Sequence, residues 1–181
     1  MKTVILLRHA KSDWNDSVAR DFDRPLNGRG KRAARRMGAW ARDENLRFDA
    51  IIASPAVRVT ETLDHFLDAY GQSIDPRWDR RIYLASAATL LDVLRDLPDD
   101  LATVLMVGHN PGLEDLVLDI VPDDGPDDLR VQVETKYPTA AIATVQFAAD
   151  RWTDVARPGT LTTFVRPRDL DAALGPDVRQ H

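Results

Sequence analysis

Short runs of apolar residues alternate along this chain with longer segments whose apolar positions recur at helical spacing. The runs at residues 3–7, 49–53 and 103–107 are compact and rich in β-branched or aliphatic residues, and they predict buried strands. Helical spacing predicts helices over residues 28–44, 55–69, 86–97 and 111–120. This alternation of strand and helix favours an α/β protein whose central sheet is mostly parallel.

The residues at the helix starts and the last apolar runs refine this picture. We expect Ser54 and Asn110 to act as N-caps, with Pro55 at the first helical position. The runs at 140–147 and 161–165 have no helix between them, so we expect a hairpin at one edge of the sheet. Residues 122–128 are polar and turn-rich and predict an exposed loop. No repeat or long linker divides the chain, which predicts a single domain over residues 1–181.

Composition and charge exclude several classes of function. The net charge of −5 and the isoelectric point near 5.3 do not favour a nucleic-acid partner. The chain has no cysteine, which excludes disulfides, thiolate zinc sites and cysteine nucleophiles. The apolar run at residues 3–7 is too short for a signal peptide, and no later window is long enough to span a bilayer. We therefore expect a cytoplasmic protein that does not bind membranes.

Three of the predicted strands end at residues with unusual chemistry. Arg8 and His9 follow the first strand, Arg58 lies one turn into the helix after the second, and His109 follows the third. Ligands of open α/β sheets bind beyond the carboxyl ends of the strands, so we expect these side chains to converge. Each residue alone would more often be structural, and the expectation rests on all three junctions together.

Together these residues would form a small cationic pocket. Two arginines offer forked donors that suit phosphate oxygens, and a histidine can serve as nucleophile, acid or base near neutral pH. The helix that starts near Pro111 adds free amides and the positive end of its dipole. A phosphoryl group is the ligand that this combination fits best.

Other constellations are absent from the sequence. The remaining histidines, His65 and His181, make no pair at metal-binding spacing, and there is no P-loop and no G-x-S-x-G motif. The glycines in "NGRG" at 27–30 open a basic helix after a Pro-Leu turn and do not form a dinucleotide fingerprint. We therefore expect neither a metal nor a cofactor.

The motifs at these junctions resemble those of the histidine phosphatase superfamily, the phosphoglycerate mutase-like proteins. The matching stretches are "RHAKSDWN" at 8–15, "SPAVRVTET" at 54–62 and "GHNPG" at 108–112. "RPL" at 24–26, Trp152 and "RP" at 166–167 are typical of the SixA-type phosphohistidine phosphatases within it. The resemblance spans nearly the whole chain and implies a three-layer α/β/α sandwich.

The resemblance also implies a role for each junction residue. His9 resembles the nucleophile, which takes the phosphoryl group and forms a phosphohistidine intermediate. Arg8, Arg58 and His109 resemble the residues that bind the three equatorial oxygens. Such a set fits phosphoryl transfer, in which catalysis is mostly positioning and charge stabilisation.

Substrate-binding residues and a general acid are less clearly marked. Asn15 matches a position that contacts phosphate in some members, and we expect Ser12 and Asn110 to bind substrate as well. Many relatives carry an acidic general acid, but the segment that we match to it here, residues 83–88, holds no Asp or Glu. Asp13, four residues beyond His9, is the best-placed candidate for the general acid. It is at least as well explained as an exposed loop residue with no catalytic role.

A missing acid mildly favours a phosphohistidine substrate. An imidazole can leave as a neutral group, whereas an alkoxide needs a proton, and general acid catalysis is typically worth about 10²–10⁴-fold. Short connections predict an open pocket that suits a phosphorylated protein, with inorganic phosphate as the product. A phosphatase of small phosphate monoesters and a phosphoryl-binding module with little turnover remain alternatives. The arginine-rich face of residues 28–44 has two interpretations, a docking surface for an acidic partner and an ordinary solvated face. We favour the solvated face.

Overall fold

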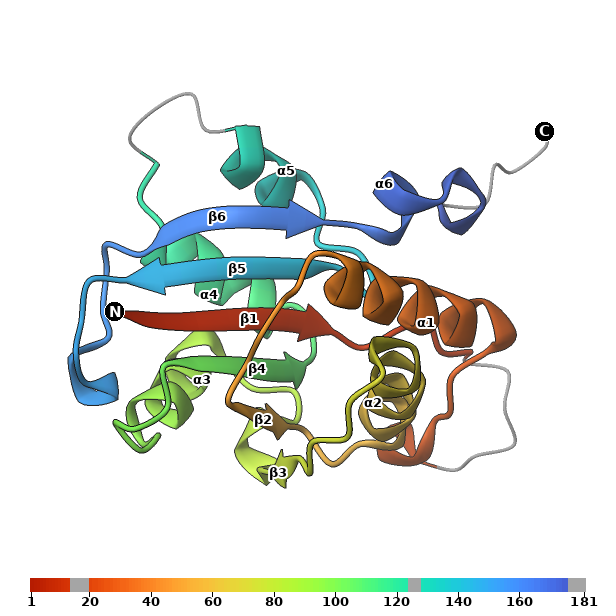
Figure 1. Ribbon diagram of the computed structural model, residues 1–181, viewed down its shortest axis with the longest axis horizontal. Helices are drawn as coiled ribbons and strands as arrows, with labels where there is room; N and C mark the ends of the chain where they lie inside the picture. The colour runs from red at the N-terminus through yellow and green to blue at the C-terminus, as the bar shows by residue number, and fades with distance from the viewer. Residues whose placement is uncertain (14–19, 124–127, 176–181) are drawn as a thin grey trace.

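The computed structural model describes residues 1–13, 20–123 and 128–175, which build one six-stranded sheet with helices on both faces (Figure 1). The strand order is β3-β2-β4-β1-β5-β6. The strands are β1 (Lys2–Arg8), β2 (Ala50–Ala53), β3 (Arg77–Trp78), β4 (Thr103–Gly108), β5 (Ile142–Phe147) and β6 (Thr160–Val165).

The pairing of these strands confirms the predicted sheet. β4 pairs in parallel with both β1 and β2, and β2 pairs in parallel with β3. β5 runs antiparallel to β1 and to β6, so the last two strands form the expected hairpin at one edge. The parallel part of the sheet carries the three junctions at which the sequence places its chemistry.

Helices cover the sheet in two layers and confirm the α/β/α sandwich (Figure 1). α1 (Gly28–Asp43), α2 (Val57–Tyr70) and α6 (Pro167–Leu170) lie on one face. α3 (Ala87–Arg95), α4 (Gly112–Ile120) and α5 (Asp128–Thr135) lie on the other. α5 was not expected from the sequence, and residues 124–127 of the predicted loop lie outside the described part of the chain. No helix among the described residues is long and apolar enough to cross a membrane.

The central strand β1 is buried on both faces. Val4 and Leu6 pack with α3, α4 and α5, while Ile5 and Leu7 pack with α1 and α2. All four side chains are at most 1% exposed. A strand that is covered on both sides needs a continuous apolar run rather than an alternating one, which explains why this strand could be read from the sequence.

Two helices begin later than the sequence predicts. α2 begins at Val57, because Ala56 is extended with ψ 143°, and the expectation that Ser54 is its N-cap is wrong. The Ser54 hydroxyl accepts a hydrogen bond from the Ala56 amide at 3.3 Å instead. α4 begins at Gly112 with Pro111 in the N-cap position, yet the Asn110 side chain still accepts a hydrogen bond from the Glu114 amide at 3.2 Å.

The start of α1 packs tightly against the segment that follows β1. A Cβ at Gly30 would lie 2.2 Å from the carbonyl oxygen of Lys11, so only glycine allows this approach. The Asn27 side chain caps the helix by accepting from the Gly30 amide at 2.7 Å, and the Asn27 amide donates to the same Lys11 carbonyl at 3.0 Å. The helix thereby fixes the backbone just beyond His9.

Candidate active site

The strand register brings the three predicted junctions to one edge of the sheet. Arg8 pairs with Gly108, and Ala53 pairs with Val107, so the residues that follow these strands are neighbours. They line a pocket of about 440 Å³. Its lining comprises Arg8, His9, Lys11, Ser12, Asp21, Arg24, Arg58, Leu84, His109, Asn110 and Thr139. Among the residues that the sequence singled out, Arg8, His9, Arg58 and His109 are thus brought together.

His9 is held as a neutral imidazole with one free nitrogen. Its Nδ1 lies 2.7 Å from the carbonyl oxygen of Ala10, and because a carbonyl only accepts, Nδ1 carries the proton. Nε2 therefore keeps the lone pair that a nucleophile needs. Burial lowers the pKa of His9 to about 3; the hydrogen bond to Ala10 opposes this effect, and the neighbouring His109, Arg8 and Arg58 add to it. The ring is consequently uncharged at neutral pH.

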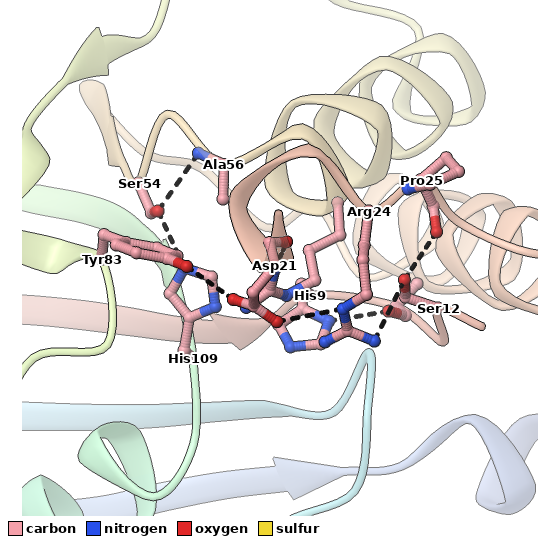
Figure 2. Close-up of polar contacts among 11 residues, drawn as sticks. His9, Ser12, Asp21, Arg24, Pro25, Ser54, Ala56, Tyr83 and His109 are labelled. Carbon is pink, nitrogen blue, oxygen red and sulfur yellow. Dashed lines mark hydrogen bonds and ion pairs between the residues drawn. The ribbon is translucent and has the colours of Figure 1, made fainter. Parts of the chain in front are cut away.

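His109 faces His9 and is held from behind by a serine. The two ring centroids are 5.3 Å apart, and Nε2 of His109 lies 2.8 Å from the Ser54 hydroxyl (Figure 2). Burial and the charge of Arg58 lower the pKa of His109 to about 3. The buried Ser54 hydroxyl accepts from the Ala56 amide, and its own proton has no acceptor among the described residues other than Nε2 of His109. We therefore assign Ser54 as the donor to Nε2, which leaves the proton of His109 on Nδ1. Nδ1 is buried and has no partner among the described residues.

The two arginines supply fixed positive charge. Nη1 of Arg8 donates to the carbonyl oxygen of Tyr137 at 2.8 Å. Arg58 is only 2% exposed, and its guanidinium donates to the Asp21 carbonyl oxygen at 2.8 Å and to Asp21 Oδ2 at 3.0 Å. A buried guanidinium with so little contact with water interacts strongly with any anion that enters the pocket.

Asp21 is a site residue that the sequence did not reveal. Its carboxylate accepts from Arg58, from Arg24 Nε at 3.0 Å and from the Tyr83 hydroxyl at 2.5 Å (Figure 2). Burial alone would raise the pKa of Asp21, but the hydrogen bond from Tyr83 and the charge of Arg58 outweigh it and lower the pKa to about 2. Asp21 is therefore ionised at neutral pH. The sequence held one indication of such a residue: a buried Arg58 needs an acidic partner, although the sequence does not say which one.

Ser12 and Asn110, which we expected to bind substrate, both line the pocket. The Ser12 hydroxyl donates to the carbonyl oxygen of Pro25 at 2.6 Å and accepts from Arg24 at 3.5 Å. The Asn110 amide donates to the carbonyl oxygen of Tyr137 at 3.0 Å. Both side chains thus connect the pocket wall to neighbouring segments of the chain.

Asp13 and Asn15 are the remaining predicted site residues. Asp13 is exposed, accepts from the Asn27 side chain at 3.0 Å and is not among the residues that line the pocket. This placement gives no support to Asp13 as a general acid. Asn15 lies outside the described residues.

Metal-binding groups do not gather in the described part of the chain. Across residues 1–13, 20–123 and 128–175, no three His, Asp or Glu side chains lie close enough together to hold an ion. The cationic side chains that line the pocket are Arg8, Lys11, Arg24 and Arg58.

Known proteins are similar to this chain in sequence and in fold. The family model of the histidine phosphatase superfamily (branch 1) matches residues 4–81. An uncharacterised protein of Mycobacterium tuberculosis is 35% identical over 165 residues, which cover 90% of this chain and 100% of the relative.

Solved structures extend the match over the whole fold. A protein of Agrobacterium tumefaciens assigned as the phosphohistidine phosphatase SixA is 30% identical with a TM-score of 0.74, covering 92% of this chain and 99% of that one. A second protein assigned as SixA, from Nakamurella multipartitia, is 28% identical with a TM-score of 0.78. The match covers 92% of this chain and 96% of that one. These similarities and the pocket support a phosphatase, and the chain belongs to the histidine phosphatase superfamily.

Proposed function

We propose that this protein hydrolyses phosphohistidine on proteins through a covalent phosphohistidine intermediate on Nε2 of His9. The observation that carries the proposal is the hydrogen bond from His9 Nδ1 to the Ala10 carbonyl, which leaves Nε2 unprotonated in a pocket with Arg58 and His109. The two solved structures described above, which are similar to this chain, are both assigned as SixA phosphohistidine phosphatases, and this similarity supports the proposal.

The reaction divides into two displacements at phosphorus. In the first, Nε2 of His9 forms a bond to phosphorus while the bond from phosphorus to the substrate nitrogen breaks. The substrate imidazole leaves as a neutral group because its other ring nitrogen already carries a proton. In the second, water attacks the phosphorus, releases inorganic phosphate and restores neutral His9. Each step is a phosphoryl transfer with a loose transition state, so the protein contributes mainly position and charge.

The oxygens of the transferring group need donors that are already in place. Arg8 and Arg58 supply forked, permanently charged donors, and the protonated Nδ1 of His109 supplies a third. An incoming phosphoryl dianion favours protonation of His109, because its negative charge offsets the positive field of the neighbouring arginines. Ser12 and Asn110, at the rim, are placed to bind the oxygens or the group that leaves.

The acidic content of the pocket favours a phosphohistidine substrate over an alkyl ester. Asp21 is the one carboxylate among the described residues that line the pocket, and with a pKa of about 2 it holds no proton to donate at neutral pH. An imidazole can leave as a neutral group, whereas an alkoxide requires protonation that is typically worth about 10²–10⁴-fold. Loss of a general acid therefore penalises ester hydrolysis more.

Paired hydrolysis rates test this proposal. The substrates are a protein domain that carries phosphohistidine and a phosphoserine peptide, each measured for the wild type and for His9→Ala. We expect a strong preference for the phosphohistidine domain and no activity above background in the variant. Equal or faster cleavage of the phosphoserine peptide would refute the proposal and indicate a phosphatase of phosphate esters. Tight binding of vanadate without turnover of either substrate would indicate a binding module.

A further inference from the structure

A second cavity lies directly beside the catalytic pocket. It has a volume of about 490 Å³, close to the 440 Å³ of the pocket itself. The two cavities share Arg8, Lys11 and Thr139 as lining residues, so they lie side by side. The second cavity, called the basic groove here, runs between the start of α1, the segment before β5 and α6, which lies beside α1 (Figure 1).

The charge of the basic groove is opposite to that of the whole protein. Six of its eleven lining residues are cationic, namely Arg8, Lys11, Arg29, Lys136, Arg166 and Arg168, and none is acidic. The chain as a whole has a net charge of −5. A concave surface lined by one sign of charge concentrates the electrostatic potential and attracts the opposite charge.

Not all of this charge is available to a ligand, yet a strong excess remains. Arg166 is paired with Asp169, through Nε at 3.0 Å and Nη2 at 2.9 Å. That pair fixes the start of α6 and thereby the position of the neighbouring Arg168. Lys136 and Arg168 are exposed to solvent, so their charges face an approaching partner.

The character of these cations favours acidic side chains over a second phosphate. The catalytic pocket binds its anion with buried forked donors, as shown by Arg58 at 2% exposure. The basic groove instead presents exposed lysines and arginines from separate segments, along with Pro138, Pro167 and Leu174. Dispersed charges beside apolar side chains match several carboxylates on a polypeptide better than one compact dianion.

We propose that the basic groove binds acidic side chains that flank the phosphorylated residue of a protein substrate. This inference rests on the proposed function, since it names the feature by which that site selects its substrates. Electrostatic attraction of this kind raises the association rate and the selectivity for the right partner more than it raises the intrinsic rate of the chemical step.

The test compares two peptides that each carry one phosphohistidine. In one, Asp and Glu residues flank the phosphorylated position on both sides, and in the other Asn and Gln replace them. We expect the wild type to show a kcat/KM about tenfold higher for the acidic peptide, with similar kcat values. In Lys136→Ala/Arg168→Ala the preference should fall to about twofold or less, and added salt should produce the same loss in the wild type.

A matched variant removes two arginines elsewhere. Arg47 and Arg77 are exposed, and neither lines the pocket or the basic groove. Arg47→Ala/Arg77→Ala changes the net charge by the same amount and should keep the wild-type preference. An equal loss in both double variants would overturn the proposal, because it would show a general effect of net charge.

Binding of an unphosphorylated hexaglutamate peptide separates this inference from the proposed function. Saturable binding to the wild type that Lys136→Ala/Arg168→Ala abolishes would support the basic groove even if no phosphohistidine were hydrolysed. Phosphohistidine hydrolysis with no preference for the acidic peptide and no hexaglutamate binding would overturn the inference and leave the proposed function standing. A preference for a sugar bisphosphate over its monophosphate that depends on Lys136 and Arg168 would likewise overturn it, in favour of a small-molecule site.

Discussion

Arg58 and Asp21 form a two-point contact at the centre of the pocket, in which Nη1 donates to the Asp21 carbonyl oxygen at 2.8 Å and Nη2 to its carboxylate at 3.0 Å. The contact joins residues that are 37 positions apart in the chain. It satisfies a guanidinium that is only 2% exposed, and it places a negative charge beside the position proposed for the phosphoryl group.

Replacement of Asp21 by Asn should strengthen the binding of inorganic phosphate. The amide keeps one oxygen for Arg58 and Tyr83 and gives up the hydrogen bond from Arg24. It also removes a charge that repels the anion, and unit charges about 4 Å apart interact by about 1 kcal/mol even in a water-like dielectric. We expect the inhibition constant of phosphate to fall about fivefold at pH 7, measured by competition with a chromogenic substrate. Asp23→Asn, two residues away and paired with Arg20, should leave it unchanged.

Weaker phosphate binding in Asp21→Asn would contradict this expectation. It would show that Asp21 acts chiefly by orienting Arg58, and that its charge contributes little to the field in the pocket.

Ser54→Ala should reduce activity through His109. The Ser54 hydroxyl lies 2.8 Å from Nε2 of His109 and is fully buried, so its loss leaves that nitrogen without a partner. A hydrogen bond contributes about 0.5–1.5 kcal/mol, which predicts a two- to tenfold fall in kcat/KM. In a His109→Ala background the same substitution should have almost no further effect on kcat/KM. Independent, additive losses in the double variant would refute this positioning role.

Acidification should destabilise the protein because of its two buried histidines. The pKa of each is about 3 in the folded state, against about 6.5 when unfolded, so below pH 6.5 the unfolded chain takes up protons that the folded chain does not. Their contribution to stability is therefore complete above pH 6.5 and is lost progressively down to about pH 3. Between about pH 6 and pH 3, each histidine lowers the free energy of unfolding by about 1.4 kcal/mol for every pH unit of acidification.

Urea unfolding at pH 7 and pH 5 measures this effect. His9→Asn/His109→Asn should lose markedly less stability between the two pH values than the wild type, while His65→Asn, on a partly exposed helix position, should behave like the wild type. Titration of the His9 and His109 ring protons by NMR with midpoints near pH 6.5 would contradict the pKa values that the structure implies.

The central residues of the site could be predicted from the sequence because they lie at or just after the carboxyl ends of strands. Arg8 is the last residue of β1, His9 follows it, and His109 follows β4; these buried strands are parallel and end at one edge of the sheet. Their convergence follows from topology alone, without knowledge of any side-chain contact. The same holds for Arg58, which lies in the first turn of the helix after β2.

The residues that the sequence did not reveal are those whose role depends on contacts across the fold. Asp21 lies in a short 3₁₀ turn, Asp21–Asp23, with no periodic pattern, and it reaches Tyr83, 62 positions away. Ser54 was expected to be a helix cap, but the helix begins only at Val57, and the Ser54 hydroxyl lies 2.8 Å from Nε2 of His109 instead. The basic groove draws its cations from several separate segments, so no single stretch displays it.

The most direct test of the account is to trap the phosphoenzyme and locate its phosphoryl group. The wild type is mixed with an excess of phosphohistidine substrate, quenched in alkali within milliseconds, and examined by peptide mass spectrometry and phosphorus NMR. We predict one phosphoryl group on Nε2 of His9, because Nδ1 is occupied by its bond to Ala10, and none in His9→Ala. A phosphoryl group on His109, on Nδ1 of His9, or turnover that continues in His9→Ala would contradict the account.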